Sequence, residues 1–360
     1  MIFAKGNTFL TSIIADYEFF EPQTPGQQFA RDRLLIECLR PDKPAHYQIA
    51  EEYPLVLGPE GTRHSICVAL KGHDSGTSAF LAHANLWFRT MACGTELAAG
   101  SSAVKLALVG NVATNPREQG KGWMRTLLGE IERRALSQGA DAIVLWSDLE
   151  SFYQKLGFEP AGTEIRMTLS TKKLRRYSQA NLKENLDKAV DVKVWLPDGY
   201  RTGELPEELI ERMLHLRSTG FNQPFFQLER SPQEFSELLK IPDLSLFVGH
   251  GVNSGGLPTI DFFFIVGKGM DMQGIIHEWG TTDMNLLIGG AAIVAKHVGL
   301  DELTILVPPA IISERLTTLR RVCTRNEHHP MAWVKTLNPK TKSLVEQALH
   351  KGFIWGLDSI

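Results

Sequence analysis

The chain has no strong excess of charge and few cysteines. Its 360 residues hold 38 Lys and Arg against 41 Asp and Glu, a formal net charge of −3. This balance offers no basic field to a nucleic acid, and we expect no such partner. Its cysteines are widely spaced, which favours reduced thiols in a cytoplasmic protein over a disulfide framework. They are Cys38, Cys67, Cys93 and Cys323.

Long apolar runs are also missing. No stretch approaches the roughly 20 apolar residues that span a bilayer, so we expect no membrane partner. Residues 1–30 are apolar enough to suggest a signal segment, but Gly6, Asn7 and Thr8 interrupt the run, and we interpret 1–30 as a structured leader. A hydrophobic content of 43% is typical of a globular protein with sizeable cores.

Motifs for several other chemistries are incomplete. His277-Glu278 begins like a zinc-protease helix, but Thr281 stands where the second histidine is required, so we expect no metal. The segment 267–269, Gly-Lys-Gly, lacks the upstream glycine and downstream Ser or Thr of a P-loop. No Gly-x-Ser-x-Gly elbow and no cysteine with a credible base is present. Metal-dependent and covalent catalysis are therefore not predicted.

The length favours two domains, at about 100–200 residues each. We expect the first over residues 31–170 and the second over 191–360. The polar and basic segment 171–190 between them has the composition of a linker.

Apolar periodicity and turn residues predict the elements of each domain. In the first, strands are expected at 33–40, 62–70, 78–93, 105–113 and 142–146, with helices at 44–57 and 122–138. In the second, strands are expected at 245–249, 259–266, 273–279 and 303–307, with helices at 204–217 and 283–298. The fold class is therefore α/β (α+β), a mixed, mostly antiparallel twisted sheet flanked by helices, in two tandem lobes.

The most informative segment is 111–128, which reads as a strand end, a turn with Gly120 and Gly122, and a helix start. Glycine lets the main chain approach a ligand closely, and N–H groups at a helix N-terminus favour an anion. The turn thus predicts a phosphate cradle. A second buried strand and the segment 152–158, Phe-Tyr-Gln-Lys-Leu-Gly-Phe, follow soon after.

This order of parts resembles the GNAT N-acetyltransferase superfamily over roughly residues 30–170. The family's Gln/Arg-x-x-Gly-x-Gly/Ala loop matches 119–124, with one departure, since Met124 stands where a small residue is usual. A shifted register beginning at Arg117 also exists, but Pro116, three residues before Gln119, favours the first. The resemblance implies acetyl-CoA as co-substrate, with its pyrophosphate on this loop.

The resemblance also places the pantetheine arm along the preceding strand and gives an oxyanion role to the N–H of Ala113 or its neighbour. The residues expected to contact the coenzyme are Asn111, Val112, Ala113, Thr114, Gln119, Gly120, Lys121, Gly122, Trp123 and Met124.

Tyr153 is the expected general acid, because family members place a tyrosine there. A phenol of pKa about 10 keeps its proton at neutral pH and can give it to a thiolate of pKa near 8.5. The alternative is that Tyr153 only packs against its aromatic neighbours. Asp148, Glu150 and His83 are open candidates for the base that would deprotonate the amine.

The second lobe repeats the succession of elements without the glycine turn. Residues 278–307 parallel 112–146, but Thr281-Thr-Asp-Met-Asn stands at the turn, so we expect a degenerate GNAT-like lobe that shapes the acceptor site or supports a homodimer. The predicted function is direct transfer of an acetyl group to a small-molecule or protein amine. Two alternatives stay open, a CoA-binding or regulatory protein without turnover and a longer-chain acyltransferase.

Overall fold

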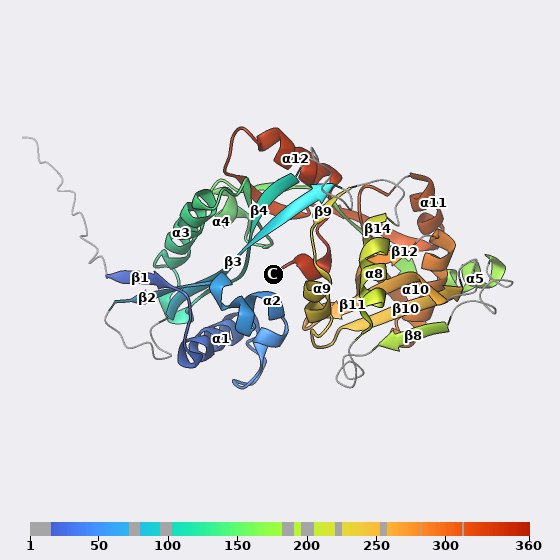
Figure 1. Ribbon diagram of the computed structural model, residues 1–360, viewed down its shortest axis with the longest axis horizontal. Helices are drawn as coiled ribbons and strands as arrows, with labels where there is room; N and C mark the ends of the chain where they lie inside the picture. Colours follow the sequence, from blue (N-terminus) through green and yellow to red (C-terminus); the bar gives the residue numbers. More distant parts are fainter. Residues whose placement is uncertain are drawn as a thin grey trace, which may run out of the picture.

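The computed structural model describes residues 16–71, 80–93, 103–181, 191–195, 205–219, 225–252, 258–281, 283–311 and 313–360. They form two halves that lie side by side, each a twisted sheet with helices against it (Figure 1). No helix in the described ranges is long and apolar enough to cross a bilayer.

The first sheet joins its strands in the order β1-β2-β3-β4-β5-β15-β6, and β9 pairs with the end of β3. All neighbours are antiparallel except β4 and β5. The bounds are β1 Tyr17–Phe20, β2 Ser65–Leu70, β3 Phe80–Cys93, β4 Ala103–Thr114, β5 Ala142–Leu145, β6 Glu159–Ala161, β9 Phe226–Leu228 and β15 Ala332–Thr336.

The helices of this half are α1 (Pro25–Leu39), the short α2 (Pro54–Leu57), α3 (Trp123–Ser137) and α4 (Glu150–Gln154). Helix α3 presents Leu127, Leu128 and Ile131 to a core that includes Val109 and Leu145. This core fixes the start of α3, and with it the glycine turn, against β4.

The second sheet has the order β14-β7-β13-β12-β11-β10-β8, again antiparallel except for β12 and β13. Its bounds are β7 Glu164–Ser170, β8 Asp191–Trp195, β10 Ser245–Val252, β11 Pro258–Lys268, β12 Asp271–Thr281, β13 Glu302–Val307 and β14 Cys323–His329. The helices of this half are α5 Thr171–Asn181, α8 Glu207–Thr219, α9 Pro232–Leu238, α10 Met284–Val298 and α11 Ser313–Val322. The remaining helix, α12 (Lys342–Lys351), lies beside the first half (Figure 1).

The expected repetition of elements is present in the structure. β12, α10 and β13 follow one another as β4, α3 and β5 do, and each strand pair is parallel. The turn before α10 is closed by side chains, because Asp283 caps the helix through the N–H of Asn285 at 2.7 Å and the Thr281 hydroxyl donates to the Asp283 carbonyl at 2.9 Å. A carboxylate thus occupies the helix start at which the first half has glycine.

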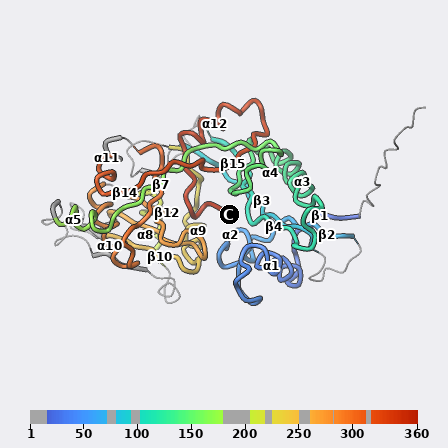
Figure 2. The backbone as a smooth tube through the Cα atoms, turned by 180° about the vertical axis from the view of Figure 1, so that it is seen from behind, coloured from blue at the N-terminus to red at the C-terminus, as the bar shows by residue number. Residues whose placement is uncertain are grey.

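The two sheets exchange strands. β7 comes from the first half of the sequence but pairs with β13 and β14, whereas β15 comes from the second half and lies between β5 and β6. Figure 2 shows β7 among the strands of the second half and β15 on the side of α4. Segments 31–170 and 191–360 therefore do not each hold one complete sheet.

The end of the chain lies between the two halves (Figures 1 and 2). Trp355 packs edge-on against Trp279 of β12, and Asp358 joins a buried ion quartet with Arg217, Arg230 and Glu278. Arg217 Nη2 and Asp358 Oδ2 are 2.7 Å apart. The two guanidinium groups hold the pKa of Asp358 below its usual value despite burial.

Beyond the quartet, the chain reaches β4. A Cβ atom added at Gly110 would lie 1.9 Å from the main-chain oxygen of Ile360, so only glycine allows this approach. The last residues thus bring the quartet of the second half into contact with the strand that borders the glycine turn.

Two predicted elements are wrong. Of residues 33–40, expected as a strand, 33–39 lie in α1 and Arg40 is the C-cap of this helix. The helix begins inside the expected leader, with a capping box between Thr24 and Gln27 and with Pro25 in the first turn. The helix expected over 44–57 is replaced by a 3-10 turn, Ile49–Glu51, and by α2. The expected linker begins as α5, which ends at Asn181; residues 182–190, like the first part of the leader at 1–15, lie outside the described ranges.

Candidate functional site

A splayed pair of parallel strands forms the site. β4 pairs with β5 from Leu106 to Val109, but β5 ends at Leu145 while β4 continues to Thr114. Among the described residues, no strand therefore lies beside the last residues of β4 on the β5 side. Their main-chain groups on that side are available to an extended ligand.

A bulge in β4 lies at the same point. Asn111 has a φ of 47°, and the pairing with β3 shifts there, so that Asn111 and Val112 stand opposite Ala84 alone. The side-chain amide of Asn111 donates to Asn85 Oδ1 at 2.9 Å, and the main-chain carbonyl oxygen of Asn111 lies 2.9 Å from His83 Nδ1. Both partners are fully buried. The bulge is therefore held by side chains of β3 from beneath the sheet.

The register between β3 and β4 determines which N–H groups of β4 donate hydrogen bonds to β3. Asn115, just after β4, donates its N–H to the Leu81 carbonyl at 2.9 Å. Hydrogen-bonded pairs alternate along antiparallel strands, so Ala113, which faces His83, also bonds to β3. The N–H of Ala113 thus points away from the ligand side.

Thr114 has the opposite orientation. Thr114 and Ala82 form a non-hydrogen-bonded pair of the antiparallel ladder, so the main-chain N–H and carbonyl of Thr114 point away from β3. Its carbonyl accepts the Cys38 Sγ–H from α1 at 3.4 Å. Of the two residues, Thr114 therefore presents its N–H to the opening between β4 and β5.

The turn before α3 has the backbone geometry of a cradle. Gly120 and Gly122 have φ values of 78° and 90°, which side chains disfavour, and a Cβ at either would meet no atom within 4 Å. Gly122 is also the N-cap of α3, with no side chain in the capping position. The first N–H groups of α3 thus lack a side-chain cap and are open to an anion.

Two cationic side chains, Lys121 and Arg125, flank the glycine turn, and they differ in whether a carboxylate already pairs with them. Lys121 donates to both carboxylate oxygens of Glu118 at 3.0 Å, and Glu118 also accepts the indole N–H of Trp123 at 3.2 Å. Arg125, one turn further on, is exposed and has no ion-pair partner among the described residues. Sequence reasoning missed Arg125; its signal was a cation in the first turn of a helix that follows two glycines.

Two adjoining cavities cover the turn and the splayed strands. The larger, of about 470 Å³, is lined by Glu37, Cys38, Leu39, Val112, Ala113, Thr114, Pro116, Gln119, Met124, Leu149, Phe152 and Tyr153. The smaller, of about 350 Å³, is lined by Thr114, Glu118, Gln119, Gly120, Gly122, Trp123, Met124, Arg125 and Phe152. They share Thr114, Gln119, Met124 and Phe152, so together they form one cleft from the glycine turn to Tyr153.

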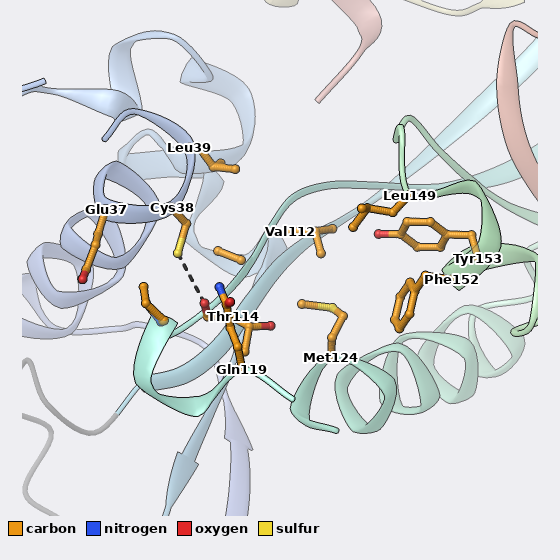
Figure 3. Close-up of a pocket in the computed structure, with 12 residues that line it drawn as sticks. Glu37, Cys38, Leu39, Val112, Thr114, Gln119, Met124, Leu149, Phe152 and Tyr153 are labelled. Carbon is orange, nitrogen blue, oxygen red and sulfur yellow. Dashed lines mark hydrogen bonds between the residues drawn. The ribbon is translucent and has the colours of Figure 1, made fainter. Parts of the chain in front are cut away.

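The structure brings most predicted coenzyme residues to this cleft. Asn111 and Lys121 do not line either cavity; Asn111 is instead buried in the bulge, and Lys121 is exposed beside Glu118. Met124 lines both cavities, and its side chain points into the cleft between Gln119 and Phe152 (Figure 3). At the position where a small residue is usual in the family, this chain thus has the longer Met124 side chain, which narrows the middle of the cleft.

Tyr153 lies at the other end of the cleft from the glycines. Its ring packs edge-on against Phe152 and Phe158, and only 3% of the residue is exposed. Its hydroxyl points toward Val112 and Leu149 (Figure 3). Burial raises the pKa of this phenol, although a hydrogen bond with Ser147 opposes the shift. The tyrosine therefore stays protonated at neutral pH and faces the ligand space while it packs.

The three candidate bases lie elsewhere. Asp148 and Glu150 are exposed and line neither cavity. His83 is fully buried under the bulge, where desolvation lowers its pKa to about 3. Its ring is therefore neutral, and it is hydrogen-bonded to the main-chain carbonyl of Asn111. Among the described lining residues of the larger cavity, only Glu37 carries a carboxylate, and it points away from Tyr153 (Figure 3).

In the described part of the chain, no three His, Cys, Asp or Glu side chains gather in a way that could hold a metal ion. His277 of the incomplete zinc motif is buried in β12, with its Nε2 2.8 Å from the Gly267 carbonyl.

Comparison with known proteins connects this geometry to a family. Residues 89–161 match the family model described as an acetyltransferase (GNAT) domain. These residues include the bulge, the glycine turn and Tyr153. No curated protein sequence matches the chain.

Solved structures share the fold over most of the chain. A probable N-acyltransferase of unknown function from Enterococcus faecalis is 12% identical, with a TM-score of 0.58 over 89% of this chain and 72% of that one. A GCN5-related N-acetyltransferase from Anabaena variabilis is 15% identical, with a TM-score of 0.58 over 92% and 75%. The N-myristoyltransferase of Saccharomyces cerevisiae with bound myristoyl-CoA is 14% identical, with a TM-score of 0.51 over 90% and 83%.

At these identities the solved structures show the fold alone, and the family model assigns the segment that carries the cleft. Residues 89–161 therefore match the GNAT acetyltransferase domain, and the chain around them shares the fold of the solved GNAT structures.

Proposed function

We propose that this protein transfers an acetyl group from acetyl-CoA to an amine within a ternary complex. The observation that carries the proposal is the continuous cleft, which has an anion cradle at Gly120 and Gly122, a strand edge in its middle and a protonated phenol at Tyr153. These three features meet the three needs of a thioester donor: a phosphate site, an amide-binding edge and an acid for the leaving thiolate.

In this proposal the first turn of α3 binds the pyrophosphate. The main-chain N–H groups after Gly122 are open, and each charge-assisted bond to a phosphate would contribute about 1.5–3 kcal/mol. Arg125 adds a cation that no described carboxylate pairs, whereas Lys121 is engaged by Glu118 and mainly shapes the turn. The pantetheine arm lies along Val112–Thr114, beside the end of β5.

The acyl group then lies near Thr114, Val112 and Tyr153. The N–H of Thr114 is free of β3 and supports binding of the arm or of the carbonyl oxygen, for which a preorganised donor contributes roughly 3–4 kcal/mol. The amine nitrogen forms a bond to the carbonyl carbon, the C–S bond breaks, and the sulfur takes the proton of the Tyr153 hydroxyl. The ammonium form of the amine loses one proton to water before this attack, and the proton that the nitrogen sheds afterwards returns through water to the Tyr153 phenolate.

Water is assigned this role because no described side chain that points into the cleft is a base at neutral pH. Burial raises the pKa of Cys38 to about 11, and Glu37 points outward. A lysine-like amine, of pKa about 10.4, then carries a penalty near 4.6 kcal/mol at pH 7, since about one molecule in 2,500 is neutral. Acceptors with lower amine pKa should therefore react faster.

The test combines coenzyme binding with turnover. Calorimetry with CoA should show binding to the intact protein and loss of binding in Gly122→Glu, whose carboxylate would stand in the cradle. Gly299→Glu is the matched control, because Gly299 also has a positive φ of 71° and open space at Cβ but lies at the C-cap of α10.

Mass spectrometry of the protein with acetyl-CoA and an amine library should then show acetylated product. CoA binding without transfer to any amine would favour a regulatory CoA-binding protein. Transfer from longer acyl-CoAs but not from acetyl-CoA would favour a longer-chain acyltransferase, the class of enzyme to which the yeast N-myristoyltransferase belongs by name.

A further inference from the structure

The end of the cleft around Tyr153 has an apolar wall. Leu39 of α1, Val112 of β4 and Leu149 of the loop before α4 line the larger cavity there and none of them lines the cavity of the glycine turn. They lie along one side of the space that the Tyr153 hydroxyl faces (Figure 3).

Leu149 marks where this wall meets solvent. It is 64% exposed, which is unusual for a leucine beside a buried tyrosine. An exposed residue that also lines the cavity flanks its entrance. An acceptor that enters from solvent would cover Leu149, and covering apolar surface contributes about 25 cal/mol per Å² to binding.

The charged residues at the α1 side of this end are engaged or turned away, and the exposed Asp148 and Glu150, on either side of Leu149, line neither cavity. Glu37 points away from Val112 and Tyr153 (Figure 3). Arg40, which follows Leu39, is paired with Glu52 at 2.5 Å and with Asp271 at 3.0 Å. Among the described lining residues, none offers a carboxylate toward Tyr153 that could hold a second positive charge of an acceptor.

We infer that the acceptor is a primary amine on an uncharged apolar body, such as an arylalkylamine, with the body against Leu39 and Leu149. The inference rests on the proposed function. A polyamine would place its additional charges against this wall, where no described lining residue supplies a counter-charge, and this is costly when water is excluded. The exposed carboxylates of Asp148 and Glu150 lie outside the cavity, and ion pairs at such surface positions contribute little. A small hydroxylated amine would leave the wall uncovered.

The experiment compares kcat/KM for phenethylamine, ethanolamine and spermidine with acetyl-CoA as donor. Phenethylamine should exceed the other two by about tenfold or more, a difference of about 1.4 kcal/mol. Leu149→Asn should lower the ratio of kcat/KM for phenethylamine to that for ethanolamine by about tenfold. Leu136→Asn is the control, because Leu136 is 53% exposed on α3 and lines neither cavity; it should change neither value.

Three outcomes overturn the inference. Spermidine or ethanolamine could equal or exceed phenethylamine, which leaves the acetyltransferase intact but removes the apolar acceptor. Leu149→Asn could alter the preference among acetyl-, butyryl- and octanoyl-CoA while the order of amines stays the same, which assigns the wall to the acyl chain. If no amine is acetylated although CoA binds, the proposed function fails and the inference fails with it.

Discussion

Trp333 donates its indole N–H to the main-chain carbonyl of Ser147 at 3.0 Å. Trp333 lies in β15, beside Leu145 of β5, and Ser147 lies in the loop that leads to α4. None of the described residues that line the cleft comes from beyond residue 190. The second half of the sequence therefore reaches the site by holding this loop rather than by forming its wall.

Trp333→Phe should loosen the loop that carries Leu149 and precedes Tyr153. Loss of one neutral hydrogen bond costs about 1 kcal/mol of stability, and a displaced catalytic group would lower kcat by about tenfold. Trp279→Phe is a matched control, since Trp279 donates to the Leu306 carbonyl at 2.7 Å in the second sheet. Thermal unfolding should shift in both variants, whereas steady-state kinetics should change only for Trp333→Phe. An equal loss of kcat in both would contradict the positioning role.

Tyr153→Phe should reduce kcat by about 10²–10⁴ while CoA affinity is retained, because only the transferable proton is removed. Tyr177→Phe, on α5, should have no such effect. A Tyr153→Phe protein with unchanged kcat would show that Tyr153 serves packing alone.

The pH profile of the intact protein supplies a second readout. An acid acts while protonated, and burial raises the pKa of Tyr153 above its ordinary value of 10. The rate should therefore rise with pH as the amine loses its proton, with no fall below about pH 10. A falling limb near pH 7 to 8 would indicate a different acid.

Arg125→Gln should weaken CoA binding by about tenfold, the loss of one exposed charge-assisted contact. Lys121→Gln should have a smaller effect, because Lys121 is already paired with Glu118. Calorimetry at two salt concentrations would measure both, and the salt dependence should decrease more in Arg125→Gln. The reverse order of effects would reassign the phosphate contact to Lys121.

Stability should fall in acid partly through His83. Its pKa is about 3 in the folded protein and about 6.5 when unfolded, so the unfolded chain binds the extra proton between these values. The contribution of His83 to the free energy of unfolding is complete above pH 6.5. It is lost as the pH falls, at up to about 1.4 kcal/mol per pH unit. Denaturant titrations from pH 6.5 to 4.5 should show a shallower decline in His83→Asn, by about 2 kcal/mol in total. The exposed His46→Asn should follow the unmodified protein, and identical slopes for all three would refute the assignment.

Asp358→Asn should destabilise the protein by about 3–5 kcal/mol, because it leaves Arg217 and Arg230 with excess buried charge. Glu237→Gln, which breaks the exposed pair with Lys240, should cost less than about 1 kcal/mol. Equal effects in chemical denaturation would show that the quartet is not a close-paired network.

Local patterns in the sequence predict much of this site. The glycine turn, the helix after it and Tyr153 could be read because each depends on neighbours within a few residues. The capping box at Thr24 was an equally local signal, and overlooking it turned α1 into an expected strand. The orientation of Thr114 toward the cleft could not be read, since it depends on the register with β3 and on a bulge held by His83 and Asn85.

The exchange of β7 and β15 between the sheets could not be predicted from the sequence for a related reason. β7 and β15 both have ordinary apolar character, and nothing local says which sheet each one joins. Their partners lie more than 100 residues away, as with Thr168 and Thr304, or Val334 and Val144. Sequence order therefore suggested two successive units where the backbone is interlaced.

The exchange of β7 and β15 constrains synthesis and dissection of the protein. A ribosome must release residues up to about 336 before β15 can fill the gap between β5 and β6, so the first half cannot complete its sheet while its own residues are being translated. A fragment that ends near residue 190 would keep every described cleft-lining residue. It would nevertheless leave one edge of β5 unpaired, and β6 and β7 without the partner strands they have in the structure. The complete first sheet is thus a structure that this chain acquires only after β15 has been made.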